Sequence, residues 1–345
     1  MTATFGDEIT RFIGQCIGTP DFEALQLAGD ASTRKYYRIV FENQSRVLMS
    51  WEPFPDPAQY PFLNVLEHFA AVDVRVPKVE AFAPELGVVL LEDLGDLTLE
   101  RKFWENQDQK QSYPFYAQSV DELIKIHFLA SKPVVKPSLC QQTRFDTAKF
   151  MWEMNYAREH FLEKVGGLAL GTKDQQTLQG EFLDVCAALD QQPKFVCHRD
   201  YHSRNLMLKL GRIYVIDFQD ARLGPLQYDL VSLVHDSYVG LEAESIDWIK
   251  KDYLTKAAAA GPKGAIRADF DEIFKLQIIQ RCFKACGSFS SFYNARNDTR
   301  YLKYIKRTAQ LVAQTLGEDK RFPLFTTLLN DHGLIEKDYA SLCAP

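Results

Sequence analysis

The 345-residue sequence lacks the segments that mark export or membrane insertion. Its N-terminus, MTATFGDEIT, has no basic stretch followed by an apolar one, so we expect no secretory signal peptide. No stretch approaches the run of about 18 apolar residues that a membrane-spanning helix needs. We therefore expect a cytoplasmic protein with no membrane partner.

Paired cysteines are also lacking. The seven cysteines are scattered, with no C-x-x-C pair. An odd number without close pairs favours reduced thiols over a disulfide framework in a chain of this size. Cys282 and Cys286 lie four residues apart, but no histidine pair accompanies them at metal-ligand spacing, so we interpret them as thiols of the core.

An excess of positive charge is missing as well. The sequence has 40 Lys and Arg against 46 Asp and Glu, a formal net charge of -6. Nucleic-acid-binding proteins usually show a basic footprint, so we expect no nucleic-acid partner. The composition is 46% hydrophobic, which is ample material for a buried core.

What the sequence does contain begins with β-rich runs. The short run at 25–27 is followed by the loop AGDASTRK, by YYRIVF and by RVLMSW, with the polar turn ENQS between the last two. Residues 58–71 carry apolar side chains at helical spacing, and KVEAFA and VVLLED follow around the turn PELG. The order β-β-β-α-β-β predicts an antiparallel sheet with one helix against it.

The remainder of the sequence has mainly helical periodicity. Apolar spacing predicts helices at 119–130, 145–163, 174–189, 227–240, 269–291 and 299–317. One hairpin interrupts them, formed by NLMLKL, the turn GR and IYVIDF. A change in composition predicts a hinge at 92–97 between a β-sheet lobe, 1–91, and a helical lobe, 98–345. The fold class is therefore α+β with two lobes.

The densest chemical signal is CHRDYHSRNLMLKLGRIYVIDFQDA, residues 197–221. Phosphoryl transfer from ATP needs charge neutralisation and in-line alignment. The amide oxygen of Asn205 and the carboxylate of Asp217 can hold Mg²⁺, because the hairpin returns the chain towards Asn205. Asp200, five residues before the asparagine, can accept the proton of an attacking hydroxyl.

Each of these residues also has a structural interpretation. Asp200 alone could be a turn residue, and Asp217 alone could cap a strand. His198 is more often a structural hydrogen-bonding residue than an acid or base, and we assign it that role. Four such residues at fixed spacing on a loop, a hairpin and a strand favour a kinase site over coincidence.

These segments resemble a known superfamily. HRDYHSRN and IDFQDA…GP…YDL are similar to the catalytic segments of the aminoglycoside phosphotransferase/choline kinase superfamily, which has a protein-kinase-like fold. Gln219 stands where protein kinases have the glycine of Asp-Phe-Gly. The resemblance implies that Asp200 is the catalytic base, that Asn205 and Asp217 bind magnesium, and that Asp229 braces the catalytic loop. It also implies ATP and Mg²⁺ as cofactors.

A narrower resemblance extends over roughly residues 25–310. GDASTRKYYRI, LLEDLGDLTLER and IIQRCFKACGSFSSFYNARNDTRYL look like segments of the bacterial anomeric kinases of N-acetylmuramate and N-acetylglucosamine, which act in cell-wall recycling. This resemblance implies phosphorylation of a sugar at C1. We expect a monomer whose only partner is its small-molecule sugar substrate.

The loop AGDASTRK lies where kinases cover the ATP phosphates with backbone N–H groups. We expect Ser32 and Thr33 to contact phosphate. Kinases usually carry a lysine on the third strand, but this strand, RVLMSW, has Met49 in its place. A cation from Arg34, Lys35 or Arg38 would have to supply the charge, and the sequence leaves the choice among them open. We expect the backbone between Glu92 and Leu94 to bind adenine.

Polar candidates for the acceptor site cluster near Asp200 and on the later helix at 269–291. They are His202, Arg204, Asp220, Arg222, Asp236, Arg281 and Lys284. The basic residues among them suit a neutral or anionic acceptor better than a cationic one such as choline or an aminoglycoside. Alternatively, Arg281 and Lys284 belong to a solvated helix face.

Two other functions stay open at this point. One is a kinase for an amino alcohol or an aminoglycoside. The other is a non-catalytic nucleotide-binding scaffold, which the missing lysine suggests.

Overall fold

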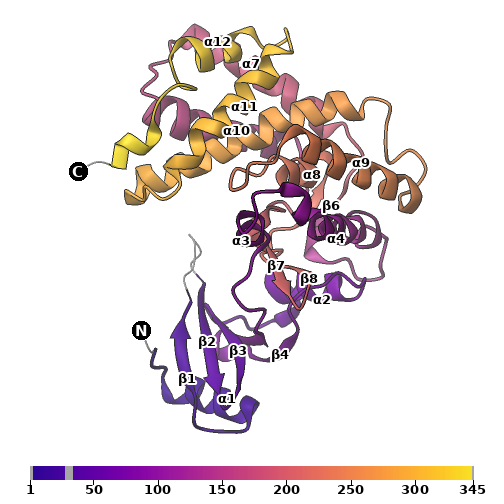
Figure 1. Ribbon diagram of the computed structural model, residues 1–345, viewed down its shortest axis with the longest axis vertical. Coiled ribbons are helices and arrows are strands. Elements are labelled where there is room, and N and C mark those ends of the chain that lie inside the picture. The colour runs from indigo at the N-terminus through magenta and orange to yellow at the C-terminus, as the bar shows by residue number, and fades with distance from the viewer. Residues whose placement is uncertain (1–2, 28–33, 344–345) are drawn as a thin grey trace.

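The computed structural model describes residues 3–27 and 34–343. Its N-terminal part is a five-stranded antiparallel sheet in the order β1-β2-β3-β5-β4, and Figure 1 shows this sheet at one end of the molecule. The strands are β1 Glu23–Gln26, β2 Lys35–Phe41, β3 Gln44–Ser50, β4 Val79–Ala83 and β5 Val88–Glu92. The order β-β-β-α-β-β predicted along the chain is confirmed by β1, β2, β3, α2, β4 and β5. The lobe boundary at 92–97 stays a prediction.

One helix covers each face of this sheet. Side chains alternate along β3 and β5, because successive residues of a strand point to opposite faces. Leu48 and Leu90 pack towards α1, Asp7–Ile17, whereas Met49 and Leu91 pack towards α2, Pro61–Ala70. The sequence prediction included α2, but it did not include α1.

The rest of the molecule is mainly helical (Figure 1). The helices are α3 Leu99–Trp104, α4 Tyr113–Ile124, α5 Leu139–Gln142, α6 Thr147–Ala157, α7 Thr172–Asp190, α8 Gln227–Val234, α9 Ala243–Ala260, α10 Phe270–Arg296, α11 Ile305–Gly317 and α12 Pro323–Asp331. Two π-helices, Lys125–Leu129 and Arg158–Val165, continue α4 and α6.

The predicted helices are present, with differences at their ends. The helix predicted at 227–240 ends at Val234, and the one predicted at 299–317 begins as an α-helix at Ile305. The π-helices keep the chain helical through the predicted segments at 119–130 and 145–163. The sequence prediction did not include α3, α5, α9 or α12.

Helix α10 is the central element of the helical part. Its long apolar surface packs against α6, α7, α8 and α11. Gly287 allows α10 and α6 to approach closely, because a Cβ atom there would lie 2.4 Å from the Cα of Ala157. The same two helices also meet at their later ends, where the amide of Asn294 donates to the carbonyl of His160.

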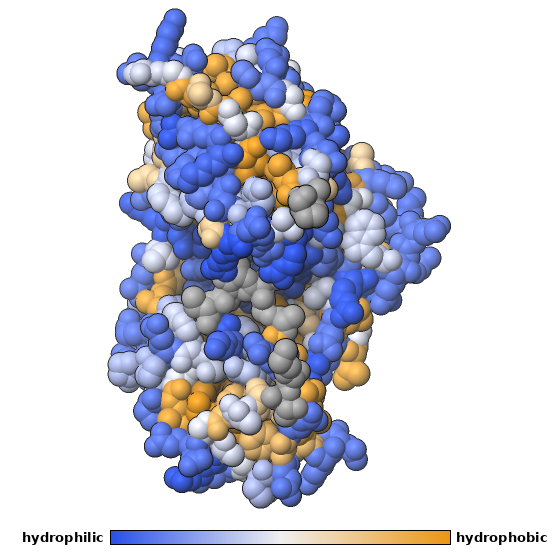
Figure 2. Space-filling model, turned by 90° about the vertical axis from the view of Figure 1, so that its left-hand side faces the viewer, coloured by the Kyte–Doolittle hydropathy of each residue, from blue (hydrophilic) through white to orange (hydrophobic). Residues whose placement is uncertain are grey.

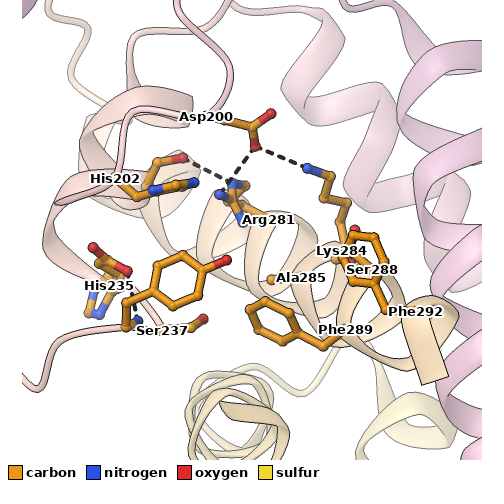
Figure 3. A pocket seen from close by; sticks show the side chains of 13 residues that line it. Asp200, His202, His235, Ser237, Arg281, Lys284, Ala285, Ser288, Phe289 and Phe292 are labelled. Atoms are coloured by element: carbon orange, nitrogen blue, oxygen red, sulfur yellow. Dashed lines mark hydrogen bonds and ion pairs between the residues drawn. The ribbon is translucent and has the colours of Figure 1, made fainter. Parts of the chain in front are cut away.

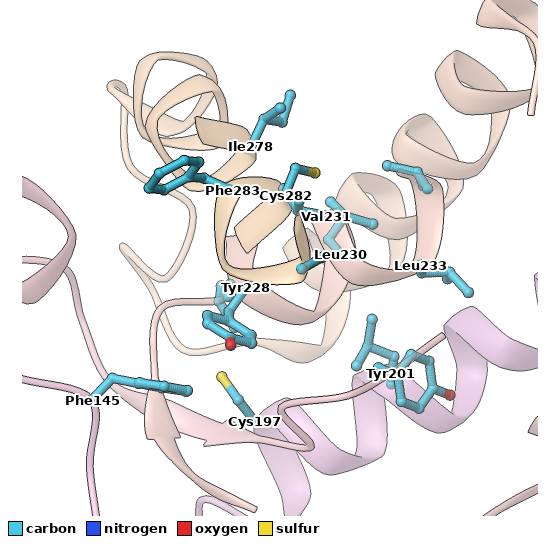
Figure 4. Close-up of a cluster of buried hydrophobic side chains, with 14 of the residues drawn as sticks. Phe145, Cys197, Tyr201, Tyr228, Leu230, Val231, Leu233, Ile278, Cys282 and Phe283 are labelled. Atoms are coloured by element: carbon cyan, nitrogen blue, oxygen red, sulfur yellow. The ribbon is translucent and has the colours of Figure 1, made fainter. Parts of the chain in front are cut away.

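The catalytic segment of the sequence is held between α8 and the two small sheets. The predicted hairpin is confirmed as β7 Leu206–Lys209 and β8 Arg212–Val215. A second pair, β6 Phe195–Cys197 with β9 Arg222–Gly224, was not predicted. Figure 4 shows the buried side chains of α8 lying beside α10 and near Tyr201 of the catalytic loop.

Five of the cysteines with described side chains are buried, and Cys16 is exposed. Cys282 and Cys286 are buried in α10, which confirms the interpretation made from the sequence. The six cysteines with described side chains are all free thiols. Within the described ranges 3–27 and 34–343, no helix is long and apolar enough to cross a bilayer.

Candidate active site

The catalytic loop leaves β6 in a strained conformation. Arg199 has a φ of 86°, which non-glycine residues rarely adopt. Asp229, fully buried in the first turn of α8, accepts hydrogen bonds from the backbone N–H groups of His198 at 2.6 Å and Arg199 at 2.9 Å. These two bonds fix the residue that precedes Asp200, which is the geometry that a bracing carboxylate requires.

His127 and Tyr253, which the sequence analysis did not indicate, form a buried hydrogen-bonded chain that ends at Asp229. His127 is fully buried, with Nε2 3.2 Å from Asp229 Oδ2 and Nδ1 2.8 Å from the hydroxyl of Tyr253. The only signal in the sequence was a lone histidine on the apolar face of a predicted helix. Cys197 lies near this pair, but hydrogen bonds already occupy Asp229, so we interpret the cluster as structural.

Asn205 and Asp217 lie side by side at the inner end of the hairpin. The Asn205 amide is 3.4 Å from Asp217 Oδ2 and also donates to the backbone carbonyl of Asp200 at 2.9 Å. His198 Nε2 lies 2.9 Å from the carbonyl oxygen of Ile216, which fixes the strand end that precedes Asp217.

The electrostatics of Asp217 suit a bound cation. Burial raises the pKa of Asp217, and the nearby charge of Asp200 raises it further. A divalent cation would relieve this concentration of negative charge. The donors that the site offers, a carboxylate and an amide oxygen, are the oxygen ligands that Mg²⁺ prefers.

Asp200 faces two cations from α10. Lys284 Nζ lies 3.2 Å and Arg281 Nη2 3.5 Å from the same carboxylate oxygen, Oδ1, as Figure 3 shows. Burial alone would raise the pKa of Asp200, but Lys284, Arg199 and Arg281 together hold it well below its usual range. Asp200 is therefore ionised throughout the neutral range.

A small cavity of about 90 Å³ opens beside Asp200 (Figure 3). Burial lowers the pKa of His202 in its wall to about 3, so this imidazole is neutral. The predicted residues that line the cavity are Asp200, His202, Asp236, Arg281 and Lys284. Phe289 and Phe292 also line it. The lining residues that the sequence did not indicate are Ser232, His235, Ser237, Tyr238, Ala285 and Ser288.

Three of the predicted acceptor residues make other contacts. Asp236 accepts hydrogen bonds from the backbone N–H groups of Ser203 and Tyr238, each at 2.8 Å, so it shapes the wall of the cavity. Asp220 and Arg222 line neither this cavity nor the larger one between the lobes. The carboxylate of Asp220 lies 3.1 Å from the guanidinium of Arg199.

Arg204 is held by side chains of the helical part. Its guanidinium pairs with Glu100 at 2.8 Å and lies 3.8 Å from the ring centroid of Tyr238. It also donates to the hydroxyl of Tyr304 at 2.8 Å. Arg204 lines the larger cavity rather than the smaller one.

This larger cavity, of about 550 Å³, lies between the sheet and the helical part. It is lined from the sheet side by Tyr36 and Val47 and from the hairpin side by Met207 and Ile216. The remaining lining residues are Leu27, Phe62, Pro77, Leu91, Glu92, Asp93, Leu94, Gly95, Asp96, Thr98, Arg204, Asn205, Asp217 and Phe218. On the face of the molecule in Figure 2, hydrophilic side chains predominate around the waist between the two parts.

Glu92 and Leu94 line this cavity, which is the place expected for a segment that would contact adenine. The backbone N–H of Glu92 bonds to the carbonyl of Lys78 at 2.8 Å, and its side chain pairs with Lys209 at 2.7 Å. These contacts hold the segment in place. They leave the carbonyl of Glu92 and the N–H of Leu94 as the backbone groups to consider for a ligand.

The three cations proposed to replace the missing lysine occupy different surroundings. Arg38 is bound to Asp93 at 2.6 Å and to Asp96 at 2.9 Å, so its charge is neutralised at the hinge. Lys35 begins β2 with an exposed side chain. Met49, in the place of the lysine, is fully buried.

Arg34 lies beside the aromatic residues of the sheet. Its guanidinium lies 5.0 Å from the ring centroid of Trp51. Burial raises the pKa of Tyr36 to about 12, and the charge of Arg34 opposes this shift. Arg34 also opposes, to a smaller degree, the upward shift that burial gives the pKa of Asp217. Ser32 and Thr33 lie outside the described residues.

Comparison with known proteins gives one consistent result. A model of the phosphotransferase enzyme family matches residues 23–262. The N-acetylmuramate/N-acetylglucosamine kinase of Neisseria meningitidis serogroup B is 32% identical over 302 residues, which cover 85% of this chain and 88% of the relative. The kinase of the same name from Pseudomonas putida is 30% identical, covering 84% of this chain and 82% of the relative.

A solved structure shows the same fold. The ADP-bound aminoglycoside phosphotransferase APH(2'')-Ib superposes with a TM-score of 0.59 at 14% sequence identity, covering 90% of this chain and 99% of that one. This likeness establishes the two-lobed, protein-kinase-like fold predicted from the sequence.

Proposed function

Because the chain belongs to the phosphotransferase enzyme family, we propose that it transfers the γ-phosphoryl group of ATP to the anomeric C1 hydroxyl of N-acetylmuramate, N-acetylglucosamine or both. Such a product would belong to peptidoglycan recycling. The chain is a phosphotransferase with a hydroxyl acceptor and a small-molecule substrate. ATP, magnesium and the identity of the sugar are the proposed parts.

One observation carries this proposal: Asn205 is hydrogen-bonded both to the backbone of Asp200, which lines the smaller cavity, and to Asp217, which lines the larger cavity together with Asn205. The larger cavity has room for a nucleotide, with adenine against the backbone of Glu92 and Leu94. Asn205 and Asp217 would hold Mg²⁺, which when bound neutralises phosphate charge. Arg34 would supply positive charge from the sheet side of the cleft.

The reaction needs little from the protein beyond positioning and electrostatics. The acceptor oxygen forms a bond to the γ-phosphorus, and the bond from that phosphorus to ADP breaks. Asp200 receives the hydroxyl proton as the oxygen attacks. Because the loop is fixed through Asp229, the carboxylate of Asp200 is held in place for this step.

The charges in the smaller cavity support an acceptor without positive charge. Lys284 and Arg281 both line it and share Asp200 as their ion-pair partner. The other carboxylate in its wall, Asp236, accepts hydrogen bonds from the backbone N–H groups of Ser203 and Tyr238 instead. A cationic aminoglycoside or choline would be repelled there. The lactyl carboxylate of N-acetylmuramate would be attracted, and the neutral N-acetylglucosamine would be tolerated.

A coupled assay of ADP release tests this function. The acceptors are N-acetylmuramate, N-acetylglucosamine, choline and an aminoglycoside, each with Mg²⁺ and again with EDTA. We expect Mg²⁺-dependent turnover with the amino sugars only, and a C1-phosphate in the ³¹P NMR spectrum of the product. Turnover only with choline or the aminoglycoside would contradict the assignment.

A second candidate is a nucleotide-binding protein that transfers no phosphate. The buried Met49 at the position of the usual lysine is the observation that favours it. The same assay separates the two, since this candidate binds ATP but releases no ADP with any acceptor.

A further inference from the structure

Two cations of α10 share the carboxylate of Asp200. Within the described ranges, neither Lys284 nor Arg281 has another carboxylate within 4.0 Å. Arg199, by contrast, has partners of its own in Asp220 at 3.1 Å and Glu153 at 3.9 Å. Asp236 lines the same cavity, but its carboxylate accepts from the backbone N–H groups of Ser203 and Tyr238. One of the two α10 cations is therefore available to an anion that enters the cavity beside Asp200.

The two cations of α10 differ in their freedom to move. Arg281 is buried and fixed, because its Nε donates to the hydroxyl of Ser232 at 2.9 Å. Lys284 carries its charge on a flexible stem, makes its one described side-chain hydrogen bond to Asp200, and lines the open cavity. Figure 3 shows both side chains directed at Asp200. A lysine is a compact point charge that can follow a moving anion, whereas a packed arginine cannot.

The transferred phosphoryl group must pass within reach of Lys284. The reacting hydroxyl lies about 3 Å from Asp200 when it is hydrogen-bonded to it. The attacked phosphorus lies about 3–3.5 Å beyond that oxygen. The phosphoryl oxygens therefore come within roughly 6 Å of Asp200 Oδ1. Lys284 Nζ is already 3.2 Å from Oδ1, so a rotation of its side chain brings it to them.

A cation is needed at this place, because charge spreads over the phosphoryl oxygens during transfer. β3 does not provide it, since Met49 stands in the place of the usual lysine and is buried. Arg34, the cation proposed on the sheet side, lines neither cavity. We propose that Lys284, supplied from α10, is the catalytic cation that stabilises the phosphoryl group during its transfer, whichever oxygen accepts it. This inference rests on the proposed function in one respect, the use of ATP as donor.

In this account Lys284 keeps its proton throughout. The hydroxyl proton goes to Asp200, the bond to the acceptor oxygen forms, and the bond to ADP breaks. Arg281 is a positioning residue. Its ion pair with Asp200 continues to balance the negative charge of that carboxylate when Lys284 turns towards the phosphoryl group. The role differs from acceptor binding, because it operates even when water replaces the sugar.

The test compares two reactions of the full-length protein. One is phosphorylation of N-acetylmuramate, and the other is slow hydrolysis of ATP without a sugar. We expect Lys284→Met to lower both rates by a similar factor, about 10²–10³, the usual cost of removing one preorganised group at a developing charge. Lys284→Arg should retain part of both rates. ADP affinity, measured by calorimetry, should not change.

The matched control is Lys275→Met. Lys275 lies on the same helix, is exposed, pairs with Glu318 at 2.7 Å, and lines neither of the two cavities. We expect this variant to keep both rates. Should Lys284→Met fail to bind ADP, Lys284→Gln takes its place in the same comparison.

Unchanged hydrolysis in Lys284→Met, with a raised KM for the sugar, would overturn the proposal and leave Lys284 as an acceptor-binding residue. If the unaltered protein phosphorylated no sugar, the proposed function would fail. The comparison of the two hydrolysis rates would then still decide the role of Lys284.

Discussion

At the scale of single residues, local spacing was enough to predict the centre of the site. Asp200, Asn205 and Asp217 lie within one loop and one hairpin, so short-range geometry brings them together. Arg281 and Lys284 were candidates by charge alone, because nothing local places α10 beside the catalytic loop. Asp220 and Arg222 were predicted from proximity in sequence, yet their side chains line neither cavity.

The role of Asp200 as proton acceptor leads to a direct prediction. Asp200→Asn should lower kcat by about two to four orders of magnitude, the usual worth of a positioned general base. ADP binding should persist, because Asp200 lines only the smaller cavity. The control is Asp269→Asn, a half-buried carboxylate that is paired with Arg267 and lines neither cavity. A kcat near that of the unaltered protein would rule out the assignment.

At the scale of elements, apolar runs beside polar turns and helical spacing predicted most of the fold. β3 and β5 correspond to the runs RVLMSW and VVLLED, and both were found. The strands β6 and β9 have only three residues each, too few to show a period. Helix α9 was missed, although it has 18 residues, because its buried stripe includes a serine and an alanine and only two large side chains, Ile249 and Tyr253.

Close packing of α10 on α6 depends on one glycine, and this can be tested. Gly287→Ala would place its Cβ 2.4 Å from the Cα of Ala157, so the helices must separate. We expect a loss of about 1–3 kcal/mol in the free energy of unfolding, measured with urea. Activity should fall as well, because Lys284 is carried by the same helix.

Gly180→Ala is the matched control for this prediction. Gly180 lies inside α7, and an added Cβ would meet nothing within 4 Å. Here the variant should gain about 0.5–1 kcal/mol from the higher helix propensity of alanine. Equal changes in the free energy of unfolding for the two substitutions would show that the close approach of α6 and α10 does not contribute to stability.

At the scale of the whole molecule, two lobes share one core cluster. One face of the sheet, α2 and the helices form a continuous set of buried side chains. Phe62 and Phe69 of α2 contact Phe218, the residue after Asp217, with ring centroids 5.3 Å and 5.9 Å apart. Such long-range contacts could not be derived from one sequence, since they depend on how separate elements pack.

Buried histidines predict how the stability of the whole protein depends on pH. Burial lowers the pKa of His202 to about 3 and that of His235 to about 4. The unfolded chain binds these protons at its ordinary histidine pKa, about 6.5. The unfolded state therefore takes up more protons as the pH falls below about 6.5, and the stability decreases over this range.

Urea unfolding at pH 7 and at pH 5 measures this effect. Each histidine should contribute about 1–2 kcal/mol to the decrease. His235→Gln should remove its share, so the variant should lose less stability than the unaltered protein between the two pH values. An identical pH dependence in the variant would contradict the assignment to His235.

The central claim is that Asn205 and Asp217 hold the metal of a nucleotide whose phosphoryl group passes to a sugar at Asp200. The most direct measurement is the rate of sugar-1-phosphate formation from ATP and N-acetylmuramate, followed by ³¹P NMR over a range of Mg²⁺ concentrations, for the unaltered protein and Asp217→Asn. We predict product formation that requires Mg²⁺ and falls by at least about 10²-fold in the variant. Equal rates in both proteins, or a rate independent of Mg²⁺, would contradict the account.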